Sequence, residues 1–478
     1  MGSLFPFFGV NFIFWGLISL MRFVVERLDQ YWRNTKIFYP ATIITKFVIL
    51  IVFADLGALT AAVISETVVS PGFIFLVVII AAAAFALFVM TVALNEHRRR
   101  ILLRVNLTLA GKIKPSEVAA VIPAHNEAKT IARTINSLQR VVRSEQIFVG
   151  SDASTDNTIA IARSLGVAVE DIRPNRGKAG VLQYVIEKNG LSKRFRAIMF
   201  VDADSEVSDD YLDKALPVFD NPEVAAIAVH ALSKWEDHWP LEYSRFFAAY
   251  RIRFYRVLQA VMRYGQAWQP FNVVPIVPGF ASIYRAEILQ SVEINAPGLV
   301  IEDFNMTFEV HHKKLGRVAY LPEVRGMSRD PLRLRDYIKQ VKRWNLGFWQ
   351  TVRRHGVWSS YFCCALAIFL AEMLLLGGFF LAWPLLVAVM LVVPEWSVSV
   401  LLFSTFSVVE VTISVTAILF LTDYLLTVVV ALYERKPILL IYGLGFLALR
   451  YIDNFLFLYT LPLAFIKKSD GRWVSPKR

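Results

Sequence analysis

Apolar residues in this chain are concentrated at its two ends. Long hydrophobic stretches fill roughly residues 1–100 and 359–478, and a mixed globular pattern lies between them. About 20 apolar residues are enough for a helix to cross a bilayer. With 56% hydrophobic residues the chain is too apolar for an ordinary soluble enzyme, and with 19% charged residues it is too polar for a pure membrane bundle. We therefore expect two membrane regions that flank a globular domain.

The N-terminal region, residues 1–100, is predicted to hold two to three spans. Residues 41–64 and 73–94 are the firmer ones, and residues 6–21 form either a third span or an interfacial helix. Lys and Arg are in excess after the second firm span, and such an excess marks the cytoplasmic side of a membrane. These patterns predict a multi-pass protein of the plasma membrane whose globular domain faces the cytoplasm.

The C-terminal region, residues 359–478, contains apolar blocks for about three to five further spans and ends in a short basic tail. Its two cysteines, Cys363 and Cys364, are adjacent in an apolar run, which excludes a disulfide framework and a cysteine-based zinc site. The formal net charge of +12 fits nucleic acid, an acidic small molecule or anionic lipid. Many basic residues flank hydrophobic segments, so the distribution favours membrane lipids and no nucleic acid.

The central domain, residues 101–330, alternates between β-rich apolar runs and amphipathic helical ones. Predicted strands cover 118–122, 146–150 and 197–201, and predicted helices cover 127–138 and 155–165. This alternation predicts an α/β, Rossmann-like domain with a mostly parallel sheet and helices on its faces. Ligands of such sheets bind beyond the carboxyl ends of the strands.

Polar clusters follow each of the three predicted strands, at 123–127, at 151–156 and at Asp202 and Asp204. Two carboxylates at the spacing of Asp202 and Asp204 can serve a ribose hydroxyl and a hard divalent cation that bridges diphosphate oxygens. Taken singly each cluster has an ordinary explanation, because residues 154–156 also fit a helix N-cap and Asp-x-Asp is common in surface loops. Their shared position on one rim is what favours a ligand site.

Six motifs in order carry a resemblance to a known family. They are Pro-Ala-His-Asn-Glu at 123–127, Ser-Asp-Ala-Ser-Thr-Asp at 151–156, Arg-Gly-Lys-Ala-Gly at 176–180, Asp-Ala-Asp at 202–204, Glu-Asp at 302–303 and Gln-x-x-Arg-Trp at 340–344. Over residues 118–350 this set resembles family 2 glycosyltransferases of the GT-A fold. It is most similar to the processive cellulose, chitin, hyaluronan and poly-N-acetylglucosamine synthases.

The resemblance implies a UDP-sugar donor and Mg²⁺ or Mn²⁺ at the rim of the sheet. In this sequence Ala124, Glu127 and Asp152 would lie at the base, Lys178 at the nucleotide, and Asp202 with Asp204 at the ribose and metal. A carboxylate can accept the imide N–H of uracil, and a lysine beside flexible glycines suits an anionic ligand. The chain departs from the family at Ser151, where a second acid is common, so contact with the base would depend on Asp152.

Glu302 and Asp303 are predicted to begin a helix, where backbone N–H groups and the helix dipole favour negative charge. An ordinary acidic helix start would have the same sequence. By the resemblance, Asp303 is the general base and Glu302 belongs to the catalytic site. Inverting transfer needs a carboxylate opposite the leaving diphosphate to take the acceptor's proton.

Residues 331–358 are predicted to form amphipathic interface helices along the cytoplasmic membrane surface. A lipid-facing anchor would explain the basic character of this segment as a whole. The resemblance adds that Arg343 binds the pyrophosphate while Gln340 and Trp344 contact the acceptor. It also places Gly279 and Phe280 at the acceptor, although a plain turn fits those two residues equally well.

The leading hypothesis is metal-dependent, inverting transfer from a UDP-sugar to a growing β-linked polysaccharide, coupled to its export. Glu372, Glu410, Asp423, Arg450 and Asp453 lie in apolar surroundings and are compatible with a polar path for that glycan. Export through an incomplete channel would need a homo-oligomer or a separate partner. The alternative acceptor is a lipid such as ceramide or diacylglycerol. A transporter or receptor with a regulatory domain is a third class, and it would leave the six motifs without a purpose.

Overall fold

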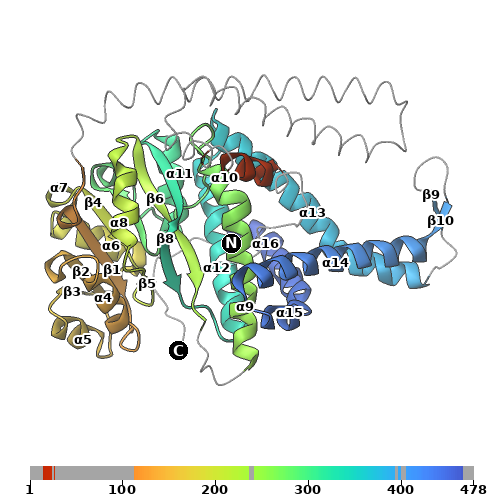
Figure 1. The fold of residues 1–478 in the computed structure, drawn as a ribbon, viewed down its shortest axis with the longest axis horizontal. Helices are drawn as coiled ribbons and strands as arrows, with labels where there is room; N and C mark the ends of the chain where they lie inside the picture. Colours follow the sequence, from red (N-terminus) through yellow and green to blue (C-terminus); the bar gives the residue numbers. More distant parts are fainter. Residues whose placement is uncertain are drawn as a thin grey trace, which may run out of the picture.

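The computed structural model describes residues 14–23, 26, 112–235, 242–392, 397–399 and 405–466. Within these ranges an α/β domain lies beside a layer of long helices (Figure 1). The predicted N-terminal spans at 41–64 and 73–94 fall outside the described residues.

The described part of the α/β domain contains an eight-stranded sheet in the order β3-β2-β1-β4-β7-β6-β8-β5. The first four strands of that order are parallel, β7 runs antiparallel to both of its neighbours, and β6 and β8 are parallel. The strands are β1 (Val118–Ala124), β2 (Ile147–Asp152), β3 (Ala168–Ile172), β4 (Ala197–Phe200), β5 (Glu206–Val207), β6 (Val224–Ser233), β7 (Ser282–Arg285) and β8 (Arg317–Ser328). The sheet is therefore mixed, because β7 and β5 run antiparallel to their neighbours while the other strands keep the predicted parallel direction.

Both faces of the sheet are covered because its central strands are apolar at every position. In β1, Val118, Ala120 and Ile122 pack with α4 (Ile131–Gln139) and α5 (Thr158–Ser164) on one face. The alternate residues Ala119 and Val121 pack on the other face, with α6 (Gly177–Lys188) and α11 (Glu302–His312). Successive side chains of a strand point to opposite faces, so this continuous apolar run produces a three-layer sandwich.

The remaining short elements of the domain connect these layers. They are α7 (Leu191–Arg194), α8 (Tyr211–Ala215) and the 3₁₀ turns η1 (Pro115–Glu117), η2 (Ser144–Gln146), η3 (Leu216–Asp220) and η5 (Ala286–Gln290). The predicted strands at 118–122, 146–150 and 197–201 are confirmed as β1, β2 and β4. The two predicted helices begin about one turn later than expected, because 127–130 and 155–157 belong to the loops at the rim.

The helical layer brings together segments that are distant in the sequence. It contains α9 (Glu242–Val257), the π-helix η4 (Leu258–Arg263), α10 (Tyr264–Gln266), α12 (Leu334–His355), α13 (Tyr361–Val392), α14 (Val408–Glu434), α15 (Ile438–Gly443) and α16 (Phe446–Ile466), and a small hairpin of β9 (Ser397–Ser399) and β10 (Thr405–Ser407) lies before α14. α12 packs against α11 and α16, and α9 packs against α14 and α15. In Figure 1, α9, α12 and α16 lie side by side next to the sheet, and α13 and α14 extend away from it.

Two helices among the described residues are long and apolar enough to cross a membrane, Tyr361–Val389 and Phe446–Ile466. This is fewer than the three to five spans predicted for the C-terminal region. The described helices α14 and α15 are not among the candidate spans.

The hypothesis that the ionisable residues of the C-terminal helices line a glycan path is wrong for three of them. Asp423 lies 2.7 Å from Arg253 and 3.3 Å from Arg450, so these groups pair with each other inside the helical layer. Asp453 accepts hydrogen bonds from Tyr250 (2.8 Å) and Tyr337 (2.7 Å). Burial of charge requires such partners, and here the partners come from the neighbouring helices.

Candidate active site

The loops after β1, β2 and β4, the first turn of α6, the loop before β7 and the start of α11 meet at one rim of the sheet. Lys178 lies at the centre of this rim. Its Nζ is 2.7 Å from Asp202 Oδ1 and 3.0 Å from Glu302 Oε1, and it donates a hydrogen bond to the Gly279 carbonyl at 3.1 Å. Four predicted site residues from distant parts of the sequence are thus in direct contact.

The charges around Lys178 hold it protonated. Burial alone would lower the pKa of Lys178, but the carboxylates of Asp202 and Glu302 outweigh burial and hold this pKa above its ordinary value. Burial raises the pKa of Asp202, the Lys178 ammonium opposes that effect, and the neighbouring charge of Asp204 adds to it. The rim therefore concentrates negative charge around a single ammonium group.

Gly279 makes this close approach of the groups feasible. A Cβ atom at position 279 would stand 2.9 Å from Lys178 Nζ and 3.0 Å from Glu302 Oε1, both shorter than ordinary contacts. A larger residue here would have to displace the ends of the Lys178 and Glu302 side chains, which form the charged centre of the site. Phe280, the next residue, is half-buried and packs against the core of the sheet near Gly326.

Asp303 is held at the first turn of α11, as the sequence predicted. Its two oxygens accept backbone N–H groups of Gly279 at 3.2 Å and Phe304 at 2.8 Å. Burial, reinforced by the charge of Glu302, raises the pKa of Asp303 to about 7. A carboxylate whose pKa lies near neutral pH is well suited to accept a proton during catalysis.

The residues predicted to contact a base lie on the same rim but are more deeply set. Asp152 is fully buried, and its carboxylate accepts the backbone N–H groups of Arg176 at 2.7 Å and Gly177 at 2.9 Å. It thereby anchors the loop that leads into α6 and Lys178. Ala124 is buried at the end of β1, and the Glu127 carboxylate accepts the Thr130 hydroxyl at 2.8 Å. Their contact with a nucleobase stays a prediction.

Asp202 and Asp204 supply the oxygen ligands that a hard divalent cation prefers. Both are half-buried, and the charge of one raises the pKa of the other, so a cation between them would relieve this repulsion. Across the described ranges, His, Cys, Asp and Glu form no group of three or more that could hold a metal. The two aspartates fit a metal that takes its remaining ligands from a diphosphate and water.

α12 presents the three residues of the Gln-x-x-Arg-Trp motif in different environments. Gln340 accepts a hydrogen bond from Arg251 Nη2 at 3.0 Å, and the Trp344 ring lies 4.5 Å from the Arg251 guanidinium. Arg343 points outward and is exposed. The structure therefore joins two of the motif residues to an arginine of α9 that the sequence did not single out.

Residues 235–268 combine aromatic residues with arginines, a composition that by itself suggests a second interfacial region. In the described part of this segment, Tyr250, Arg251 and Arg253 are instead buried inside the helical layer. The available signal was the recurrence of arginine among aromatic residues, which also suits buried cation–π contacts. The hydrogen-bond partners of these residues come from α12, α14 and α16. The sequence of the segment alone therefore could not distinguish a membrane interface from a buried helical layer.

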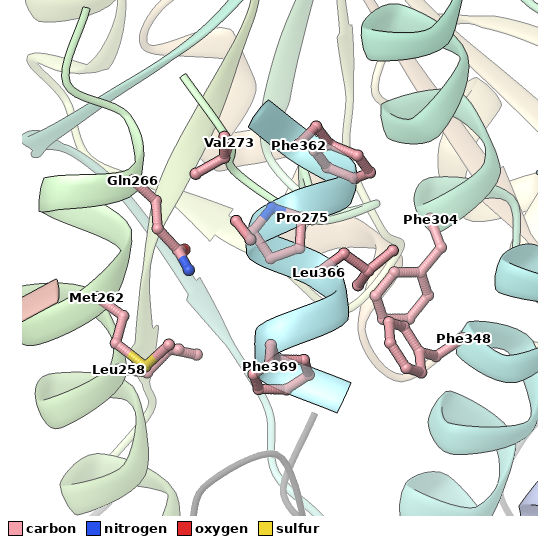
Figure 2. Close-up of a pocket in the computed structure, with 11 residues that line it drawn as sticks. Leu258, Met262, Gln266, Val273, Pro275, Phe304, Phe348, Phe362, Leu366 and Phe369 are labelled. Carbon is pink, nitrogen blue, oxygen red and sulfur yellow. The ribbon is translucent and has the colours of Figure 1, made fainter. Parts of the chain in front are cut away.

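An apolar cavity of about 40 Å³ is lined in part by Phe304, the residue that follows Asp303 in α11. Figure 2 shows Phe304 and Phe348 facing each other on one side, Leu258 and Met262 on the opposite side, and Leu366 of α13 between them. The full lining is Leu258, Met262, Gln266, Val273, Pro275, Phe304, Phe348, Phe362, Ala365, Leu366 and Phe369. Beside this cavity α11 touches the apolar helix α13 directly, because the Phe362 ring lies 4.9 Å from that of Phe308 and 4.3 Å from that of His311.

Residues 119–292 match the family described as Glycosyl transferase family 2. This part of the chain is a family 2 glycosyltransferase domain. The match confirms the predicted enzyme class and the GT-A, Rossmann-like domain with its mixed sheet. It contains Asp152, Lys178, Asp202, Asp204 and Gly279, and it ends before α11 and α12. The roles of Glu302, Asp303 and the α12 motif therefore stay predictions.

Curated relatives are similar over short stretches. The protein RfbJ of Shigella flexneri is 35% identical over 66 residues, which are 14% of this chain and 50% of that protein. The 4,4'-diaponeurosporenoate glycosyltransferase of Staphylococcus haemolyticus is 29% identical over 122 residues, 25% of this chain and 32% of that enzyme. The chain thus spans half or less of the length of the curated relatives it matches.

Solved structures are similar at low identity. The mannosyltransferase PcManGT of Pyrobaculum calidifontis, in complex with GDP-Man and Mn²⁺, has 16% identity and a TM-score of 0.45, over 76% of this chain and 97% of that chain. The glucosyl-3-phosphoglycerate synthase of Mycobacterium tuberculosis has 17% identity and a TM-score of 0.34, over 51% of this chain and 82% of that one. The assignment of the domain rests on the family match.

Proposed function

We propose that the whole chain is an inverting glycosyltransferase that moves a sugar from a UDP-sugar to an acceptor at a membrane. The observation that carries this proposal is the meeting of Lys178, Asp202, Glu302 and Asp303 at one rim of a family 2 domain. Inverting transfer needs a cationic group for the diphosphate and a carboxylate base for the acceptor. Gly279 lies between these two groups, because its carbonyl accepts a hydrogen bond from Lys178 and its N–H donates one to Asp303.

The donor end of the site consists of Lys178, Asp202 and Asp204. Mg²⁺ or Mn²⁺ held by the two aspartates would neutralise the diphosphate as the sugar leaves. Lys178 contacts Asp202 and would therefore lie close to the diphosphate. Its ammonium can exchange a carboxylate partner for a phosphate oxygen. Asp152 supports this end by fixing the backbone of the loop that leads to Lys178.

The acceptor end is assigned to Asp303. In the proposed step an acceptor hydroxyl oxygen forms a bond to the anomeric carbon, the bond between that carbon and the diphosphate oxygen breaks, and Asp303 takes the hydroxyl proton. The leaving group departs as UDP. Two backbone N–H groups fix the Asp303 carboxylate, so its orientation does not depend on substrate.

Two acceptor classes fit the site. A growing β-linked polysaccharide fits the flat Trp344 ring on α12, which can stack against a sugar. It is the leading candidate for the acceptor if the chain is a processive, multi-pass membrane enzyme. A lipid acceptor such as ceramide or diacylglycerol is favoured by the apolar cavity that Phe304 lines, because another of its walls belongs to the candidate span Tyr361–Val389. In both cases the donor end is the same.

The test is product analysis with the full chain in lipid nanodiscs. Radiolabelled UDP-glucose and UDP-N-acetylglucosamine are supplied separately with Mn²⁺ or Mg²⁺, and lipid-extractable label is separated from long, glycosidase-sensitive polymer. Polymer would establish the polysaccharide acceptor, and a short lipid-linked product would establish the lipid acceptor. If the protein neither releases UDP nor transfers sugar with any of the donors, the proposed function is overturned.

A further inference from the structure

Arg251 of α9 fits against one face of α12. Tyr337, Gln340 and Trp344 follow one another at intervals of three and four residues, so they share one side of that helix. The Arg251 guanidinium carbon is 4.9 Å from the Tyr337 ring centre and 4.5 Å from that of Trp344, and Nη2 donates to Gln340 Oε1 at 3.0 Å. One buried cation therefore contacts both predicted acceptor residues of the motif.

A contribution to fold stability does not by itself explain why position 251 is an arginine. Its side chain is fully buried, yet within the described residues Nε and Nη1 have no hydrogen-bond partner. The carboxylate that balances its charge, Asp330, is 4.0 Å away. A buried charge with incomplete pairing costs more free energy than an apolar side chain of similar size. A role in holding other groups explains why the position carries a planar cation.

Asp330 is the counter-charge of Arg251. It lies between β8 and α12, and burial raises its pKa to about 7, with the charge of Arg251 opposing and that of Asp204 adding to the shift. The pair of Arg251 and Asp330 therefore links α9 to the segment that leads from β8 into α12.

We propose that Arg251 is a positioning residue for the acceptor, which fixes the Trp344 ring and the Gln340 amide relative to the donor rim. The inference rests on the proposed glycosyl transfer and deepens it. A planar guanidinium can lie against two rings and still direct one N–H at an amide oxygen, whereas the compact ammonium of lysine cannot do both. Arg251→Lys keeps the charge and removes this geometry.

The matched control is Arg253→Lys. Arg253 is also buried on α9, but it binds Asp423 and Thr427 of α14, away from the Gln-x-x-Arg-Trp motif. Both variants are compared with the wild type in nanodiscs, using the UDP-sugar that gives product and three acceptor probes. The probes are ceramide, diacylglycerol and β-linked tetrasaccharides of glucose or N-acetylglucosamine. The Kd for UDP with Mn²⁺ is measured separately.

In Arg251→Lys we expect the KM for the acceptor to rise about tenfold while the Kd for UDP changes less than about twofold, as loss of one stacked, hydrogen-bonded contact predicts. In Arg253→Lys both quantities should stay near wild type. In the Trp344→Ala background, Arg251→Lys should add little further loss, because Arg251 acts through Trp344.

An equal loss in both lysine variants, a parallel loss of UDP binding, or additive effects with Trp344→Ala would each overturn the positioning role of Arg251. A wild-type protein that transfers no sugar to any probe and releases no UDP would instead overturn the proposed function, and this inference with it.

Discussion

The rim of the sheet and the face of α12 that carries Tyr337, Gln340 and Trp344 are built in different ways. At the rim, backbone N–H groups hold the key carboxylates, as Asp152 in the proposed donor part and Asp303 in the proposed acceptor part show. On the acceptor side, buried side chains bind each other across long sequence separations, as in Arg251 with Gln340 and Tyr337 with Asp453. Backbone contacts tolerate sequence change outside the loop, whereas side-chain networks depend on every partner.

This difference suggests a division of labour. A rim fixed by backbone suits a donor whose nucleotide and diphosphate are shared by many enzymes. A side-chain network can be altered by single substitutions, so it suits the part of the site that distinguishes acceptors. The following variants break or sharpen this comparison, beginning with the largest expected effect.

Asp303→Asn should lower the transfer rate by about 10²–10⁴-fold, because an amide cannot take the acceptor's proton. The substitution leaves the donor rim intact, so the Kd for UDP with Mn²⁺ should change less than about twofold. Radiolabel transfer and calorimetric titration of UDP measure the two effects. Transfer at nearly the wild-type rate would show that another group is the base.

Asp204→Ala should weaken Mn²⁺-dependent UDP binding by about tenfold or more, because one of two carboxylate ligands is lost. Asp209→Ala is the control: Asp209 lies in the same part of the chain, but its side chain is 76% exposed and pairs with Arg140. Titrations with and without Mn²⁺ separate the metal contribution. Equal metal dependence in both variants would contradict the assignment of Asp204.

Gly279→Ala should reduce transfer about tenfold, because its Cβ would press on Lys178 and Glu302 at the centre of the donor rim. Gly378→Ala in α13 is the matched control, since a Cβ there meets nothing within 4 Å. The two rates are compared at saturating UDP-sugar. An unchanged rate in Gly279→Ala would mean that the groups around Lys178 separate freely.

The smallest expected effect is a shift in pH dependence. Asp303 must be ionised to act as a base, so kcat/KM should rise as pH increases through about 7. The charge of Glu302 contributes to this raised pKa, and Glu302→Gln should therefore move the midpoint to lower pH. A pH–rate profile of both proteins measures the shift. Identical midpoints would show that the titrating group is not coupled to Glu302.

The same raised pKa has a consequence for stability of the opposite sign. The folded-state pKa of Asp303 lies above the ordinary value of 3.8, so protonation of this carboxyl favours the folded state. This contribution is complete below pH 3.8 and is lost as pH rises through about 7. Ionisation of Asp303, which the proposed catalysis needs, therefore lowers the free energy of unfolding.

The sequence predicted the donor half of the fold well, because its signals are local. β1, β2 and β4 are apolar at almost every position, and each is followed at once by the polar residues that form the rim. β3 was missed because Ala168–Ile172 is largely exposed and contains two acids, which removes the apolar signal of a strand. β7 was missed as well, and its antiparallel insertion between β4 and β6 makes the sheet mixed.

The acceptor half could not be predicted to the same extent. Asp423, Arg450 and Asp453 look unpaired in the sequence because their partners are over a hundred residues away or on another helix, such as Arg253 and Tyr337. Arg251 gave no signal as an individual residue for the same reason. Only tertiary packing identifies which charges face each other, and residue types in an apolar run do not contain that information.

The arrangement around Lys178 also bears on which nucleotides can enter the site. The Lys178 ammonium pairs with both Asp202 and Glu302, and Asp204 adds a further negative charge, so the rim as a whole would repel a polyanion that carries no counter-ion. A nucleotide that arrives with its own divalent counter-ion gives Asp202 a replacement partner and frees the ammonium for phosphate. Donor binding would then be an exchange of ion pairs, and nucleotides without a divalent counter-ion would bind weakly.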